Sequence, residues 1–161
     1  MNHDQIKGLI KMVLLGLGKK YANPKAVDLV YWTGYVESRY EYIKQLGTGP
    51  ARSFWQIEPQ TAMSQVKNYL KFRPKVAFKC AEVTGTQSDI WVKGDKEIWD
   101  KILMVNIASG IVHCRLKYWR SPIPLPSDID EAARIWKTVY NTVHGAGSEQ
   151  KFKDMVASLP T

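Results

Sequence analysis

Apolar side chains recur every three or four residues along most of this chain, and these stretches end at glycine or proline. That spacing gathers apolar groups on one face of an α-helix, while glycine and proline mark where a helix stops. The pattern predicts a mainly α-helical chain with helices over residues 4–20, from about 23 through Glu37 to Gly47 or Gly49, 58–73, 98–118, 129–141 and 149–159. Residues 83–95, rich in threonine, serine and glycine, favour an irregular loop or a small hairpin.

Two of these helices have clear starting signals. Asn23 precedes Pro24, which suits a capping residue followed by a proline in the first turn. Ser127 or Asp128 is placed to cap the helix that follows.

A chain of 161 residues, 45% of them apolar, can bury roughly two-thirds of its unfolded surface in one core. We therefore expect a single domain over residues 1–161. The proline-rich stretch at residues 121–126 is expected to be an extended linker inside that domain, since too little chain follows it to build a second core.

The formal net charge of +8 makes the surface attractive to polyanions, which include nucleic acids, anionic membranes and bacterial cell-wall polymers. Lysine and arginine are scattered, with the densest groups at residues 67–79 and 115–120. This distribution favours a solvated basic surface over specific binding of nucleic acid.

Cysteine and histidine lack the spacing of a disulfide framework or a metal site. Cys80 and Cys114 are far apart, and the histidines do not form a ligand pattern with them. We expect two buried free thiols, no metal and no cofactor.

The apolar run at residues 9–17 is interrupted by Lys11, is too short to span a bilayer and is not followed by a cleavage pattern. It predicts neither a signal peptide nor a transmembrane segment. The chain is therefore expected to be made in the cytoplasm, and to leave it only through other proteins or lysis.

A candidate for acid–base chemistry lies at the end of the second expected helix. Glu37 and Ser38 precede a glycine-bearing turn that leads into Phe54 and Trp55. If Phe54, Trp55 or Tyr140 desolvates Glu37, its pKa is raised and it can supply a proton near neutral pH. Such a general acid is what cleavage of a glycosidic bond requires.

Four segments, taken in order, resemble the goose-type lysozyme and lytic transglycosylase superfamily. The family has Glu-Ser at the end of its catalytic helix, then a Gly-Leu-Met-Gln-x-x-Pro-x-Thr-Ala segment, a buried helix with Asn-x-x-x-Gly, and Ala-Tyr-Asn-x-Gly-x-Gly. The matching segments here are Glu37-Ser38, Ala51-Arg52-Ser53-Phe54-Trp55-Gln56-Ile57-Glu58-Pro59-Gln60-Thr61-Ala62, Asn106-Ile107-Ala108-Ser109-Gly110, and Val139-Tyr140-Asn141 with Gly145 and Gly147. Residues 49–59 further resemble small bacteriophage members of this superfamily.

The resemblance implies a lysozyme-like fold that cleaves the β-1,4 bond between N-acetylmuramic acid and N-acetylglucosamine in peptidoglycan. In lytic transglycosylases the acetamido oxygen of the substrate attacks the anomeric carbon and one Glu serves as acid and base, here Glu37. A 1,6-anhydromuramoyl end is then formed. A hydrolytic lysozyme with the same acid is the alternative, and it usually needs a second carboxylate. Candidates are Glu41, four residues after Glu37, Glu58, at a helix start, Asp89 and Asp95, and the first two are favoured.

The resemblance also implies roles for the residues around the acid. Substrate contacts are expected from Ser53, Phe54, Trp55, Gln56, Glu58, Tyr140 and Asn141. Supporting roles are expected for Ser38, Asn106 and Gly110. Glycine inside a helix is about 1 kcal/mol less favourable than alanine. A glycine at position 110 is therefore expected where close packing leaves no room for a side chain.

This chain departs from the family at the turn. Ser53 stands where the family has glycine, and Phe54 and Trp55 replace aliphatic or methionine side chains. A phage structural or glycan-binding protein without turnover is therefore a further alternative on the same fold. The expected partners are peptidoglycan glycan strands and other phage proteins. The expected place of action is the bacterial cell wall, reached as part of a phage particle or after release.

Overall fold

The computed structural model describes residues 1–141 and 144–160, which are mainly helical, as the apolar pattern predicts. The α-helices are α1 (His3–Leu17), α2 (Pro24–Ser38), α3 (Pro59–Asn68), α4 (Pro74–Thr84), α5 (Ile90–Lys93), α6 (Lys96–Val105), α7 (Ile107–Trp119), α8 (Ile129–Ile135) and α9 (Glu149–Ala157). Two 3₁₀ turns, η1 (Lys19–Tyr21) and η2 (Leu70–Phe72), and a π-helical turn, η3 (Trp136–Asn141), complete the helical elements. Within the described ranges there is no strand, only isolated bridges from Arg52 to Lys44 and to Ile57.

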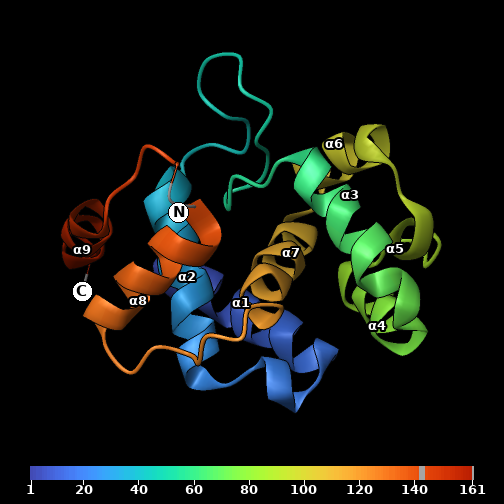
Figure 1. Cartoon of the computed structure of the whole chain (residues 1–161), viewed down its shortest axis with the longest axis horizontal. Helices are drawn as coiled ribbons and strands as arrows, with labels where there is room; N and C mark the ends of the chain where they lie inside the picture. Colours follow the sequence, from blue (N-terminus) through green and yellow to red (C-terminus); the bar gives the residue numbers. More distant parts are fainter. Residues whose placement is uncertain (142–143, 161) are drawn as a thin grey trace.

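Helix α7 runs through the middle of the molecule (Figure 1). It contacts α1, α2 and η3, and it also contacts α3, α4 and α6. Helices α2, α8 and α9 gather on one side of α7, and α3 to α6 gather on the other (Figure 1). The segment at residues 39–58 rises above the helices and returns to start α3 (Figure 1).

The single helix expected over residues 98–118 is in fact two helices, α6 and α7. Asn106 separates them because its backbone is extended, with φ −127° and ψ 103°, and its side chain accepts a hydrogen bond from the Ser109 amide. An asparagine in this conformation ends one helix and caps the next. The prediction was wrong because the apolar pattern continues through both helices.

The helix that carries Glu37 also ends earlier than expected. It stops at Ser38 because Arg39 and Tyr40 adopt left-handed conformations, with φ 54° and 58°. The hairpin considered for residues 83–95 is wrong as well. That segment turns at Gly85, which has φ +65°, and then forms the short helix α5.

The predicted helix starts are confirmed. The Asn23 side chain accepts a hydrogen bond from the Lys25 amide, with Pro24 in the first turn. Asp128 caps α8 by accepting from the Glu131 amide. These bonds satisfy amides at helix ends that have no partner within the helix.

The buried apolar side chains form one hydrophobic cluster between the helices. Its fully buried tryptophans are Trp55, Trp91, Trp99 and Trp136. Cys80 and Cys114 are free and buried, as predicted. Over residues 1–141 and 144–160, no three potential ligand side chains come together to hold a metal ion. None of the helices in those ranges is both long and apolar enough to cross a bilayer.

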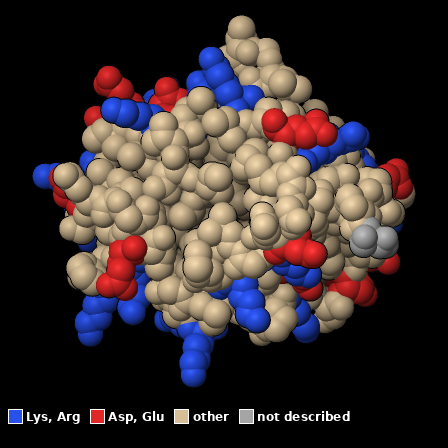
Figure 2. Space-filling view, turned by 180° about the vertical axis from the view of Figure 1, so that it is seen from behind, with Lys and Arg blue, Asp and Glu red and all other residues tan. Residues whose placement is uncertain are grey.

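Charged side chains are not gathered in one place on the face of the molecule opposite to that of Figure 1 (Figure 2). Figure 2 shows the back of the molecule, where side chains of both signs lie around the edge of the face and its centre is uncharged. Lys and Arg are more frequent along the lower edge of that view. This face therefore offers no continuous basic groove of the kind that tracks a nucleic-acid backbone.

Candidate active site

The chain reverses direction immediately after Glu37. Arg39 and Tyr40 are both left-handed, and Ser38 holds them in place. The Ser38 hydroxyl donates to the Gly34 carbonyl and accepts from the Tyr40 amide, both at 3.1 Å. The Tyr40 ring lies directly against Gly34, which leaves no room for a side chain there. Ser38 and Gly34 therefore stabilise the turn that presents Glu37.

The Glu37 carboxyl group is the centre of the candidate site. One of its oxygens, Oε1, accepts a hydrogen bond at 2.9 Å from Nε1 of Trp136. Desolvation raises the pKa of Glu37, although the Trp136 bond and the charges of Lys117 and Lys151 oppose that rise. A raised pKa keeps the proton on the carboxyl group nearer to neutral pH, as a general acid requires.

Trp136 was not assigned to the site from the sequence. It lies in η3, and its indole is 1% exposed. Its ring packs against Phe152 of α9, with centroids 5.4 Å apart. Gly147 lies so close to the indole that any side chain would collide with it. Trp136 is therefore a rigid donor. In the sequence, its spacing of four residues from Tyr140 was the signal that could have assigned it to the site.

Tyr140 links η3 to the turn that precedes α3. Its hydroxyl donates to the backbone carbonyl of Trp55, and its own carbonyl accepts from Nζ of Lys117 at 2.9 Å. The Tyr140 side chain is buried, so it positions the turn rather than facing solvent. Asn141 is partly exposed, and its Oδ1 accepts from Nζ of Lys137 at 2.9 Å.

The turn at residues 52–57 is compact. Arg52 and Ile57 exchange backbone hydrogen bonds of 2.9 and 2.8 Å. Within it, Ser53 and Gln56 have positive φ angles of 70° and 47°. The Gln56 side chain donates to the Ser53 carbonyl at 2.9 Å, so it closes this turn.

The side chains of Ser53, Phe54 and Trp55 are buried, with exposed fractions of 2%, 6% and 0%. The Trp55 indole donates to the Val30 carbonyl of α2 at 2.8 Å. Their burial does not fit the substrate contacts expected from these three side chains. They belong to the core beneath the site, where they hold the turn against α2.

The packing around Gly110 explains why α7 contains a glycine at this position. A Cβ atom on it would collide with Oγ of Ser53 and would lie 3.0 Å from Cε3 of Trp55. Close packing therefore requires glycine at this position. Asn106 acts further away, because its side chain caps α7 and donates to the Thr84 carbonyl at 2.8 Å.

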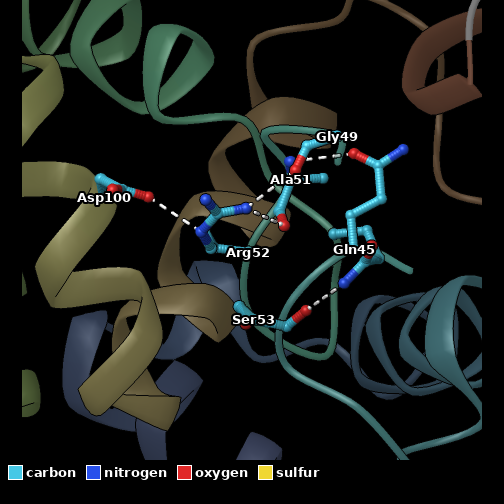
Figure 3. Close-up of polar contacts among 7 residues, drawn as sticks. Gln45, Gly49, Ala51, Arg52, Ser53 and Asp100 are labelled. Atoms are coloured by element: carbon cyan, nitrogen blue, oxygen red, sulfur yellow. Dashed lines mark hydrogen bonds and ion pairs between the residues drawn. The ribbon is translucent and has the colours of Figure 1, made fainter. Parts of the chain in front are cut away.

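Figure 3 shows how the turn is anchored to α6. Nε of Arg52 pairs with Oδ1 of Asp100 at 2.8 Å, and Nη1 donates to the carbonyls of Gly49 and Ala51, each at 3.0 Å. The Gln45 side chain accepts from the Ala51 amide at 3.0 Å. Arg52 thus connects the loop above the helices to the side of the molecule formed by α3 to α6.

The two favoured candidates for a second carboxylate, Glu41 and Glu58, are both exposed. Glu41 is exposed and follows the end of α2, so it does not share a helix face with Glu37. Glu58 is exposed at the start of α3 and makes no capping bond with its side chain. Its charge does act on Lys117. Glu37 is therefore not one of a pair of buried carboxylates formed with either residue.

Lys117 is a further residue that the sequence did not assign to the site. Burial lowers the pKa of Lys117, and the charges of Glu37 and Glu58 are among those that oppose this shift. Its ammonium group lies 4.3 Å from the centroid of the Tyr140 ring. Lys117 is one of two cationic residues, with Arg115, on the largely buried helix α7, and this was the signal for a charged group near the acid.

Comparison of the chain with known protein families, with curated proteins and with solved structures finds no match. The geometry around Glu37 and the resemblance of the four segments are therefore the basis of a functional assignment.

Proposed function

We propose that this chain has a lysozyme-like fold and cleaves the β-1,4 bond between N-acetylmuramic acid and N-acetylglucosamine in peptidoglycan. Its mechanism is that of a lytic transglycosylase, with Glu37 as both acid and base. The observation that carries the proposal is the desolvated Glu37 carboxyl group, which Trp136 holds at the end of α2.

Contacts between the four resembling segments support this proposal. Gly110 of the third segment packs on Ser53 of the second. Tyr140 of the fourth donates to the carbonyl of Trp55, also in the second. The Trp55 indole in turn bonds to α2, which carries Glu37. Segments far apart in the sequence therefore pack against one another and against the helix that carries Glu37.

The proposed first step uses Glu37 in its protonated form. It gives its proton to the glycosidic oxygen while the acetamido oxygen of the substrate bonds to the anomeric carbon and the bond to the leaving sugar breaks. Glu37 is left as a carboxylate. The Trp136 N–H and the positive charge of Lys117 stabilise this form, since both lower the pKa of Glu37.

In the second step the Glu37 carboxylate takes the proton of the muramoyl 6-hydroxyl. The oxygen of that hydroxyl bonds to the anomeric carbon, and the bond from the acetamido oxygen breaks. A 1,6-anhydro ring closes and Glu37 is protonated again. One carboxyl group thus completes the cycle, which agrees with the absence of a buried partner at Glu41 or Glu58.

Hydrolysis by the same acid is the second candidate. Glu58, which is exposed and whose charge acts on Lys117, is the carboxylate proposed to activate a water molecule in this case. A phage structural or glycan-binding protein without turnover is the third, because buried Phe54 and Trp55 provide no exposed sugar platform. In each case the proposed target is the cell wall, met within a phage particle or after release.

Release of soluble muropeptides from purified peptidoglycan tests the proposal. The wild type is expected to release them. Glu37→Gln is expected to abolish release, because a side-chain amide cannot donate a proton to the glycosidic oxygen as a carboxyl group does. Glu41→Gln is the matched control, since it removes an exposed carboxylate four residues away and should keep activity. Binding of peptidoglycan without release by the wild type would support the third candidate instead.

Measuring the stability of Glu37→Gln distinguishes a loss of activity from a loss of folding. Folding raises the pKa of Glu37, so its contribution to stability is full below the unfolded pKa and is lost as the pH rises through the folded pKa. Gln stays neutral at every pH. The Glu37→Gln variant is therefore expected to be at least as stable as the wild type at neutral pH.

A further inference from the structure

A pocket of about 510 Å³ lies between α3, the end of α7 and η3. Its lining residues are Gln60, Thr61, Ser64, Gln65, Lys117, Arg120, Ser121 and Val139. All of them except Val139 are polar, two are cationic and none is acidic. Such a lining suits a ligand that is negatively charged and also carries groups able to form hydrogen bonds.

The cations of the pocket have no carboxylate paired with them. Lys117 and Arg120 are three residues apart and both line it. None of the ion pairs among residues 1–141 and 144–160 includes either of them. Lys117 donates to a carbonyl, and the Arg120 guanidinium lies 5.3 Å from the centroid of the Tyr69 ring. An anion in the pocket would therefore gain charge-assisted bonds without displacing a protein carboxylate.

Gln65 adds a second requirement to the ligand. It is 2% exposed, and its Nε2 donates to the His113 carbonyl at 3.2 Å. Its Oε1 has no hydrogen-bond donor among the residues that the structure describes. A buried acceptor without a donor is unfavourable, so a ligand that donates an N–H or O–H is preferred.

Lys117 connects the pocket electrostatically with the candidate acid. The Lys117 ammonium bonds to the carbonyl of Tyr140, and its charge acts on Glu37. A group bound in the pocket would therefore contact a lysine whose charge also acts on the candidate acid.

We propose that this pocket binds a peptide substituent of the glycan strand, with Arg120 and Lys117 pairing with its carboxylate. A peptide supplies the carboxylate for these cations, the N–H donors for Gln65 and the carbonyls for Thr61 and Ser64. Phosphate has the charge but lacks those donors. Val139 gives the pocket an apolar wall for a small side chain such as that of alanine. This inference rests on the proposed function, because it names the part of the same substrate that the pocket recognises.

Cleavage rates on two substrates test it. One is glycan strands that carry their peptide stems, and the other is the same strands stripped of stems by an amidase. The wild type is expected to cleave the stem-bearing strands about tenfold faster, a ratio typical of one charge-assisted pair. Arg120→Gln should lose this preference and keep the rate on stripped strands. Arg134→Gln removes an exposed arginine of α8 outside the pocket and should keep the preference. Equal rates for the wild type, or a preference retained by Arg120→Gln, would overturn the inference.

A binding experiment separates failure of this inference from failure of the proposed function. A free stem tetrapeptide is titrated into the whole protein and followed by NMR, beside the same peptide amidated at its carboxylates and beside inorganic phosphate. Binding of the carboxylate form alone, weakened about tenfold by Arg120→Gln, supports the pocket even if no glycan is cleaved. Equal binding of the amidated peptide, or binding of phosphate alone, contradicts it.

Discussion

Replacing Gly110 by alanine adds one methyl group where α7 meets the turn at residues 52–57. That methyl group would collide with Oγ of Ser53 and lie 3.0 Å from both Cβ of Ser53 and Cε3 of Trp55. The neighbours cannot easily move, because Ser53 is 2% exposed and Trp55 is fully buried. Overpacking of this kind costs about 1–3 kcal/mol, which exceeds the gain of about 1 kcal/mol from alanine in a helix.

A second substitution turns this into a test of the contact itself. Ser53→Gly removes the side chain that the new methyl group would strike, and it suits the positive φ of 70° at that position. In the Ser53→Gly background, Gly110→Ala is therefore expected to destabilise the protein by at least about 1 kcal/mol less than in the wild type.

Urea unfolding of the wild type, both single variants and the double variant measures this coupling. Gly110→Ala is expected to lower the free energy of unfolding strongly in the wild type and weakly in the Ser53→Gly variant. An equal loss in both backgrounds would show that Ser53 does not set the requirement for glycine. No loss in either would contradict the packing of α7 on the turn.

Further predictions concern buried polar groups. Burial lowers the pKa of His113 to about 3, so the free energy of unfolding falls as the pH falls from about 6.5 toward 3, by up to about 1.4 kcal/mol per pH unit. His113→Phe should remove this pH dependence, and an unchanged dependence in acid unfolding would contradict the prediction. Trp136→Phe removes a donor that favours ionised Glu37, and carboxyl ¹³C NMR should show the pKa of Glu37 rising further; a fall would refute this. Tyr140→Phe leaves the Trp55 carbonyl without its donor and should lower the free energy of unfolding by about 1–3 kcal/mol; urea denaturation measures it, and a neutral result would show that water replaces the bond.

The sequence predicted the helical class and the starts of individual helices because those depend on local chemistry. Asn23 with Pro24 and Asp128 are capping signals that act within one turn. The sequence also raised close packing as the reason for glycine at position 110, and the structure supplies its partners, Ser53 and Trp55. These features can be predicted because a helix cap depends on a few neighbouring residues, and a glycine inside a helix indicates close packing whatever its partner.

Other features depend on contacts that no local pattern specifies. The indole that holds Glu37 comes from Trp136, 99 residues further along the chain. The substrate contact expected from Trp55 does not fit the structure, because its indole donates to the Val30 carbonyl inside the core. The split at Asn106 was missed because apolar residues on both sides mask a capping residue. Each of these depends on tertiary packing, which overrides local preference.

The central claim is that Glu37 alone carries the chemistry of glycan cleavage. Mass spectrometry of the products from purified peptidoglycan, digested by the wild type and by Glu37→Gln in parallel, tests it most directly. The account predicts muropeptides with 1,6-anhydromuramoyl ends from the wild type and none from the folded variant. The same products from both proteins, or no products from the wild type, would contradict it.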